Sequence, residues 1–141
     1  MQETLEKKSI KNIDFNCDLA QSFGVYKNDL EYELLPYVSS VNISCGLHSG
    51  DPMVISKSIK LAQEKNLSIG AHIGYPDLQG FGYREMNLSE EELESLVLYQ
   101  MGAIQAIANA NNLKPGDSIL IFGQEFEITG IAIEYINAVS Y

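Results

Sequence analysis

Three short segments of this chain alternate polar and apolar residues with the period of a β-strand, and a helix-like sequence follows each of them. The segments cover residues 9–16, 38–45 and 67–71. In each one, the polar side chains fall on one face and the apolar side chains fall on the other. Strands that alternate with helices predict a parallel α/β sheet joined by right-handed crossovers.

The polar face of each predicted strand leads to a titratable side chain near the C-terminal end of the strand. Asp18 follows the first segment, His48 follows the second and His72 follows the third, and the chain has no other histidine. Proteins with parallel α/β sheets place binding and catalytic groups at this edge. We therefore expect Asp18, His48 and His72 to converge, with Asn16 on the same polar face.

Two histidines and a carboxylate also form a ligand set that is typical of divalent metal sites. Asp18, His48 and His72 could bind Zn²⁺ or a similar ion and leave positions open for water. In the alternative interpretation, these polar residues cap strand ends and form hydrogen bonds with neighbouring loops. Their spacing matches no recognised ligand motif, so the sequence is compatible with both interpretations.

Capping signals mark the predicted helices. Asp51 followed by Pro52 is a strong helix start, with the aspartate as N-cap and the proline at the first helical position. Ser89 and Glu92 form a capping box at the start of a longer helix. A shorter helix is expected over residues 29–36.

The pattern changes after Asn112. A turn at Pro115-Gly116-Asp117 precedes a short apolar strand over residues 119–122. The residues that follow alternate again, which predicts a β-hairpin and not another β–α unit. We therefore divide the chain into an α/β part, residues 1–112, and a hairpin tail, residues 113–141.

Composition and charge exclude several classes of protein. The net charge is -10, whereas binding to a nucleic-acid backbone needs clustered Lys and Arg. The first residues lack the apolar stretch of a signal peptide, and no apolar run approaches the ~20 residues of a membrane span. Cys17 and Cys45 fall on the apolar faces, so we expect buried free thiols in a cytoplasmic protein.

The loop GYPDLQGFGYRE contains Asp77 and Arg84, the single arginine of the chain. A guanidinium on a glycine-rich loop above strand ends could bind a substrate carboxylate or phosphate with two hydrogen bonds. The alternative is a surface pair with Glu85 or Asp77, which would contribute little to stability. The chain lacks a GxxxxGK[ST] loop, so any ATP must be bound in another way.

Four longer motifs are more specific: FNCDLAQSFG, VNISCGLHSGDP, IGAHIGYPDLQGFGYREMNLSEEEL and LVLYQMGAI. Together they resemble the LamB/YcsF family of 5-oxoprolinase A subunits, over about Ile13 to Ala110. The resemblance implies a (β/α) barrel of the glycoside hydrolase/deacetylase type. It also implies ATP-dependent opening of the lactam ring of 5-oxo-L-proline to L-glutamate, with ATP as co-substrate and separate B and C subunits as partners.

The chain departs from the pattern of that family in two places. The first family motif usually reads Asn-x-Asp-x-Gly-Glu, but Ala20 and Gln21 replace its last two residues here, and glutamine cannot act as a base. The family also continues with a Lys-Pro-His-Gly motif and further β–α units, whereas Lys114-Pro115 precedes Gly116-Asp117. Because a closed barrel needs ~250 residues, we expect a truncated, partial barrel.

The residues and the resemblance support three functional hypotheses. In the first, the chain is an ATP-dependent 5-oxoprolinase subunit, with Asp18, His48 and His72 as catalytic residues and Asn16, Asp77 and Arg84 as substrate-binding residues. In the second, it is an inactive relative that acts as a binding or interaction module. In the third, which rests on fold type alone, it is a metal-dependent deacetylase-like hydrolase. We expect no 5-oxoprolinase activity from this chain alone.

Overall fold

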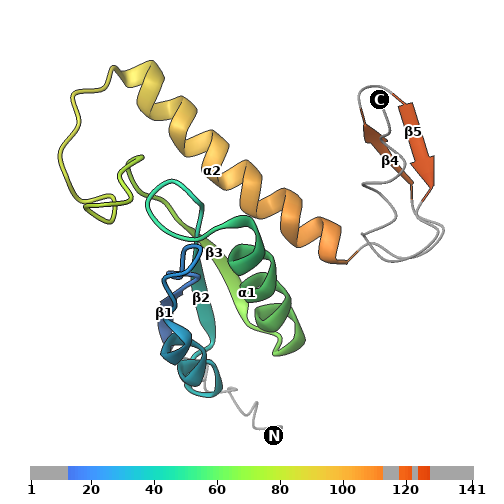
Figure 1. The fold of residues 1–141 in the computed structure, drawn as a ribbon. Coiled ribbons are helices and arrows are strands. Elements are labelled where there is room, and N and C mark those ends of the chain that lie inside the picture. The colour runs from blue at the N-terminus through green and yellow to red at the C-terminus, as the bar shows by residue number, and fades with distance from the viewer. Residues whose placement is uncertain (1–12, 113–117, 122–123, 128–141) are drawn as a thin grey trace, which may run out of the picture.

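The computed structural model describes residues 13–112, 118–121 and 124–127. Its elements are β1 (Asn16–Leu19), the 3-10 helix η1 (Asp29–Tyr37), β2 (Ser40–Ser44), α1 (Pro52–Glu64), β3 (Ser68–His72), α2 (Glu90–Asn111), β4 (Ser118–Ile121) and β5 (Gln124–Glu127). The first three strands form a parallel sheet in the order β1-β2-β3 (Figure 1). The predicted parallel α/β sheet is therefore confirmed. Strand β4 pairs antiparallel with β5.

The helix starts follow the capping signals. The Asp51 carboxylate accepts hydrogen bonds from the backbone N–H groups of Met53 and Val54 at the start of α1. Ser89 and Glu92 form both bonds of the capping box of α2. These side chains satisfy backbone donors that have no partner inside the helix. Within the described ranges, no helix combines the length and the apolar character that a membrane crossing requires.

The short helix η1 occupies the predicted position but has 3-10 geometry and extends past Pro36 to Tyr37. Proline has no N–H to donate, so it interrupts the bonding pattern of a regular α-helix. Short 3-10 turns commonly connect other elements and tolerate such an interruption near their end. The short helix predicted over residues 29–36 is therefore present, with one more residue and with 3-10 geometry.

The predicted first strand, residues 9–16, is displaced in the structure. Residues 9–12 lie outside the described part of the chain, and β1 begins only at Asn16, where it pairs with Ser40 of β2. Ile13 and Phe15 precede the strand and are 75% and 64% exposed. The alternating pattern continues through these residues, and Phe15 O accepts hydrogen bonds from the backbone N–H groups of Ser39 and Ser40. The ladder itself begins at the pair Asn16 and Ser40, at the first residue of β2, and this pairing sets the strand boundary.

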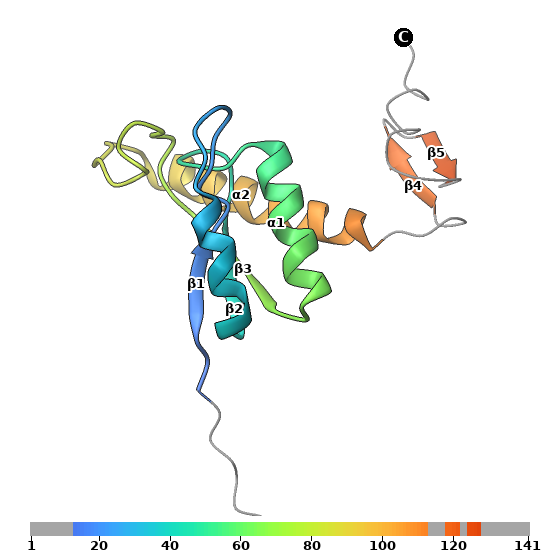
Figure 2. The ribbon, with the colours of Figure 1, turned by 60° about the horizontal axis from the view of Figure 1, so that its bottom comes forward.

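The apolar face of the sheet packs against α1. Leu19, Val41 and Ile43 are fully buried from the strand side, and Ile59 and Ala62 are fully buried from the helix side. In Figure 2, α1 runs along one side of the sheet, over β2 and β3. This core leaves the opposite, polar face of the strands free to carry the candidate site.

The two cysteines lie on the apolar face, as expected. Both are free thiols, and Cys45 is buried while Cys17 is half-buried. Burial raises the pKa of the Cys45 thiol to about 11. Cys45 is therefore protonated at neutral pH, as expected for a residue that packs in the core.

Candidate functional site

The loops that follow β1, β2 and β3 line one cavity at the carboxyl edge of the sheet. Its volume is ≈ 450 Å³. The lining side chains come from all three loops: Gln21, Phe23, Tyr26, His48, Ser49, Leu78, Gln79 and Phe81. The cavity therefore lies at the edge of the sheet where the sequence predicted the binding and catalytic groups.

The structure brings Asp18, His48 and His72 together at this edge. The rings of His48 and His72 lie edge to face, with their centroids 4.6 Å apart. The Nδ1 atom of His72 is 3.8 Å from Asp18 Oδ2. Strands β1 and β3 supply Asp18 and His72, and the loop after β2 supplies His48.

His48 is 1% exposed, and its ring is held by packing. Neither of its ring nitrogens has a hydrogen-bond partner among the described residues, and His72 Nδ1 also has none. Phe81 lies edge-on to the ring at 5.2 Å. A Cβ atom added to Gly82, which has a φ of +75°, would come within 2.8 Å of His48 Cβ. A glycine is therefore required at this close approach.

Burial lowers the pKa of His48, the nearby His72 lowers it further, and Asp18 opposes this shift. His48 is therefore neutral at pH 7. A neutral imidazole with a nitrogen that lacks a partner can accept a proton. The group of two histidines and one carboxylate is suited to general base chemistry, provided that a substrate enters the cavity.

A row of hydrogen bonds across the polar face orients Asp18. Asn42 Nδ2 donates to Asp18 Oδ1 at 3.2 Å and to Asn16 Oδ1 at 2.7 Å. Asn16 Nδ2 in turn donates to Ser40 Oγ at 2.8 Å. The neighbouring Gly70 leaves room for this row, because a Cβ there would lie 2.6 Å from Asn42 Oδ1. Asn16 thus supports Asp18, and its binding of substrate stays a prediction.

Asp77 and Arg84 bind each other. Arg84 Nε donates to both carboxylate oxygens of Asp77, at 3.0 and 2.9 Å, and Nη2 contacts Oδ1 as well. The backbone N–H groups of Gly80 and Arg84 also donate to this carboxylate, which is almost fully buried. Arg84 holds the pKa of Asp77 far below its usual range. This geometry favours the ion-pair alternative, with Asp77 organising the loop, and the substrate-binding role of both residues stays a prediction.

The metal site predicted for Asp18, His48 and His72 has no direct support in the structure. In the part of the chain that the structure describes, no three His, Cys, Asp or Glu side chains are placed so that they could hold one ion. Asp18, His48 and His72 lie close together, and their metal-ligating role stays a prediction.

Comparison with known proteins gives the relationship of the chain. The sequence model of the LamB/YcsF family matches residues 13–115. The chain belongs to the LamB/YcsF family. The match includes all three strands of the parallel sheet, both α-helices and every residue of the candidate site.

LamB/YcsF relatives are similar over the same region. A protein from Thermococcus sibiricus, named as the A subunit of 5-oxoprolinase, is 50% identical over 101 residues, which are 72% of this chain and 40% of the relative. A Bacillus cereus protein of the same name is 52% identical over 98 residues, 70% of this chain and 39% of the relative. The lactam utilization protein from Thermus thermophilus superposes with a TM-score of 0.69 and 43% identity, over 74% of this chain and 42% of that one. The chain spans about 40% of the length of the curated relatives it matches.

The two departures from the first LamB/YcsF motif lie beside the cavity. Ala20 has a φ of +66°, a backbone conformation that suits the glycine of the usual motif. The backbone N–H groups of Ala20 and Gln21 donate to the buried Glu31 carboxylate, at 3.0 and 3.1 Å. Burial raises the pKa of Glu31, and these two donors oppose the shift. Sequence patterns did not reveal Glu31, whose position in a short acidic helix gave no signal of burial.

Proposed function

We propose that this chain supplies the first part of a 5-oxoprolinase site, which opens the lactam ring of 5-oxo-L-proline to L-glutamate with ATP. The observation that carries the proposal is the convergence of Asp18, His48 and His72 at the carboxyl edge of the sheet in a LamB/YcsF chain, where His48 also lines the cavity. The relatives are named as 5-oxoprolinase, which supports 5-oxo-L-proline as the proposed substrate. They are also named as a subunit, which supports the proposal that the chain works with partner proteins. We propose that these partners are the B and C subunits.

The proposed chemistry assigns one task to each group. ATP would transfer its γ-phosphoryl group to the lactam oxygen and leave as ADP, which makes the ring carbon electrophilic. Water would add to that carbon, the C–N bond of the ring would break as a proton passes to the nitrogen, and a second water would release phosphate to leave L-glutamate. His72 would take a proton from the attacking water, and Asp18, 3.8 Å from its Nδ1, would stabilise the imidazolium that forms. His48, which is neutral because it is buried, would line the cavity without adding a second positive charge.

We also propose that turnover requires more β–α units than the described residues provide. A closed barrel of this type has ~250 residues, with its site at the centre of a ring of strand ends. Here the side chain of Asp18 is 43% exposed. Because catalysis by this group depends on excluding water and on fixed geometry, an open site of this kind is expected to be inactive.

The decisive experiment compares this chain with a chimera. In the chimera, residues 13–112 replace the matching segment of the Thermococcus sibiricus relative, which supplies the remaining length. Each protein is mixed with B and C subunits, ATP and 5-oxo-L-proline, and the release of glutamate is measured. The intact relative is the positive control.

We expect no release from this chain and measurable release from the chimera. In the chimera, His72→Ala should abolish activity, because the proposed base is removed. Turnover by the chain alone near the rate of the control would disprove the requirement for further β–α units. An active chimera that retains full activity after His72→Ala would disprove the assigned role of this histidine.

A second candidate, an interaction module without turnover, is favoured by one observation. Besides Leu93, helix α2 exposes the large apolar side chains of Leu98, Tyr99 and Met101, which are 61%, 64% and 52% exposed. Apolar residues grouped in this way commonly mark a contact surface. Tight binding of B or C subunits to this chain, together with an inactive chimera, would favour this candidate.

A further inference from the structure

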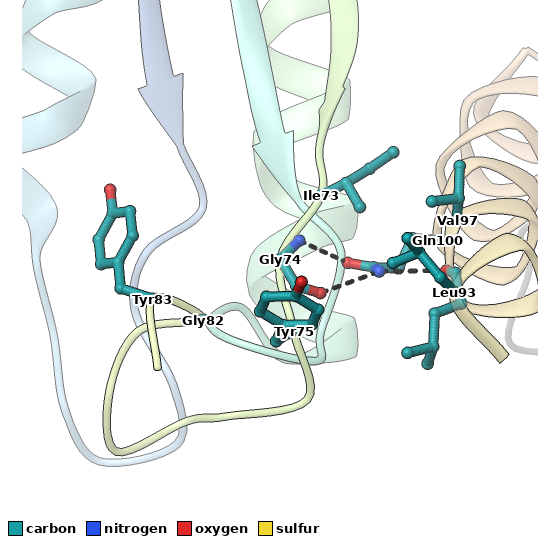
Figure 3. A pocket seen from close by; sticks show the side chains of 9 residues that line it. Ile73, Gly74, Tyr75, Gly82, Tyr83, Leu93, Val97 and Gln100 are labelled. Carbon is teal, nitrogen blue, oxygen red and sulfur yellow. Dashed lines mark hydrogen bonds between the residues drawn. The ribbon is translucent and has the colours of Figure 1, made fainter. Parts of the chain in front are cut away.

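Gln100 connects helix α2 to the loop that follows β3. The side chain is fully buried. Its Oε1 atom accepts a hydrogen bond from Gly74 N at 3.0 Å, and its Nε2 atom donates to Gly74 O at 3.0 Å (Figure 3). Nε2 also donates to Leu96 O at 3.1 Å, within α2. One amide thus holds both backbone groups of a single loop residue.

Apolar packing around this amide is incomplete. A cavity of ≈ 270 Å³ lies beside Gln100, and its lining residues come from the loop and from α2: Ile73, Gly74, Tyr75, Gly82, Tyr83, Leu93, Leu96, Val97 and Gln100. Ile73 and Leu93, from the two sides, are 37% and 44% exposed. The two bonds to Gly74 therefore fix the loop against the helix in a region where side chains do not fill the space.

Gly74 is in turn one of the residues that lie against His48. A Cβ atom on Gly74 would overlap the His48 ring at Nδ1 and Cγ, so the backbone of the loop packs directly against the imidazole ring. Because the ring nitrogens of His48 have no partner in the described structure, contacts such as this one set the ring orientation. Movement of Gly74 by less than about 1 Å would change that orientation.

We infer that Gln100 is a positioning residue for the histidine pair, and that it acts through Gly74 on the ring of His48. This inference deepens the proposed function, because the pair is the proposed catalytic centre. The hydrogen bonds of Gln100 go to Gly74 and Leu96, so its effect on the pair is exerted through the loop, on geometry and hydration. A glutamine that only stabilised α2 would leave the environment of His48 unchanged.

The test uses Gln100→Met, which keeps the length and removes both bonds to Gly74. Gln105→Met on the same helix is the matched control, because Gln105 is exposed and, among the described residues, its side chain bonds only to Asn109, one turn away. NMR spectroscopy of the ring Cε1–H groups gives the titration midpoint of His48 in each folded protein. The titratable groups that face His48 are His72 from β3 and Asp18 from β1, and both are unchanged in these variants.

In Gln100→Met, we expect the released loop to admit water, so that the midpoint of His48 rises towards its ordinary value by ~0.5 pH units or more. Gln105→Met should match the wild type. An unchanged His48 midpoint in folded Gln100→Met would overturn the inference. If that variant does not fold, Gln100→Asn decides, because its shorter side chain keeps the amide but cannot reach Gly74.

Turnover provides a separate readout. In the active chimera, Gln100→Met should lower kcat by roughly 10- to 100-fold, as small displacements of catalytic groups do. Unchanged kcat in an active chimera would also overturn the inference. If the chimera is inactive, the proposed function fails, and the NMR titration still decides the role of Gln100.

Discussion

His48 and His72 lie with their ring centroids 4.6 Å apart, and the solvent reaches only 1% of His48. Protonating His48 would place a charge in a desolvated position beside a second imidazole, and no described residue accepts a hydrogen bond from its ring nitrogens. The arrangement therefore favours a neutral His48. The free energy of unfolding therefore depends on pH through the protonation of His48.

Stability should fall on mild acidification. The folded pKa of His48 lies below its ordinary value of 6.5, so the unfolded state binds the proton more readily than the folded state. The contribution of His48 to the free energy of unfolding is fully present above the pKa of the unfolded state. It is lost as the pH falls from there towards the pKa of the folded state. Urea unfolding between about pH 7.5 and about pH 5.5 should show this loss for the wild type and a flatter profile for His48→Gln.

The carboxylates with shifted pKa values do not produce the same signal in this pH range. Asp51, Asp77 and Glu92 have lowered pKa values and titrate at more acidic pH. Glu31 has a raised pKa because it is buried, so its protonation during acidification favours the folded state and acts in the opposite direction. Equal pH profiles for the wild type and His48→Gln would show that His48 is not the source.

Asp77→Asn should loosen the loop of residues 74–85. The carboxylate accepts bonds from the Arg84 guanidinium and from the N–H groups of Gly80 and Arg84. The substitution replaces one oxygen by an amide donor and removes the charge. We expect amide hydrogen exchange at Gly80 and Arg84 to become faster by at least about tenfold.

Glu85→Gln is the control for this loop. Glu85 is exposed, and the described structure gives Arg84 a salt bridge with Asp77. Exchange should therefore stay at the wild-type rate in Glu85→Gln. Equal exchange in the two variants would mean that the Asp77–Arg84 pair does not organise the loop.

Local signals in the sequence predicted a large part of this fold. Asp51 and Ser89 were identified as helix caps because a cap depends on residues two or three positions away. The alternating faces predicted that Asp18, His48 and His72 would lie at one edge, since strands that pair in parallel bring their ends together.

Non-local contacts could not be predicted in this way. The start of β1 depends on where β2 provides a partner, which no pattern within residues 9–16 reveals. Gln100 fitted the helical period of α2, but its role depends on Gly74, 26 residues earlier. Glu31 likewise binds backbone groups 10 and 11 residues away. Buried polar residues are placed by their partners, and the partners are known only after folding.

Ala20→Gly should change the free energy of unfolding by less than about 1 kcal/mol, because three effects nearly cancel. Relief of the left-handed conformation is worth roughly 1–2 kcal/mol. Loss of a buried methyl group costs about 0.8 kcal/mol, and the added freedom of glycine in the unfolded chain costs roughly 0.5–1 kcal/mol. Urea unfolding measures the difference.

Ala20→Val is the contrasting variant at this position. Valine is β-branched, and Ala20 is fully buried at a φ of +66°. Backbone strain and overpacking should together lower stability by about 2 kcal/mol or more. A valine variant as stable as the glycine variant would contradict the conformation assigned to this residue.

Gln21→Glu should raise turnover in the active chimera. Gln21 lines the same cavity as His48, and its backbone N–H is fixed by Glu31, so a carboxylate at this position would face the site. A glutamate can accept a proton, whereas the amide cannot, and general base catalysis typically contributes roughly 10²–10⁴-fold. We expect kcat to rise by at least about tenfold. Gln79→Glu places the same charge in the same cavity from the loop after β3 and is the matched control. An equal rise in both variants would indicate a general effect of charge, and no rise in Gln21→Glu would exclude position 21 from the reaction.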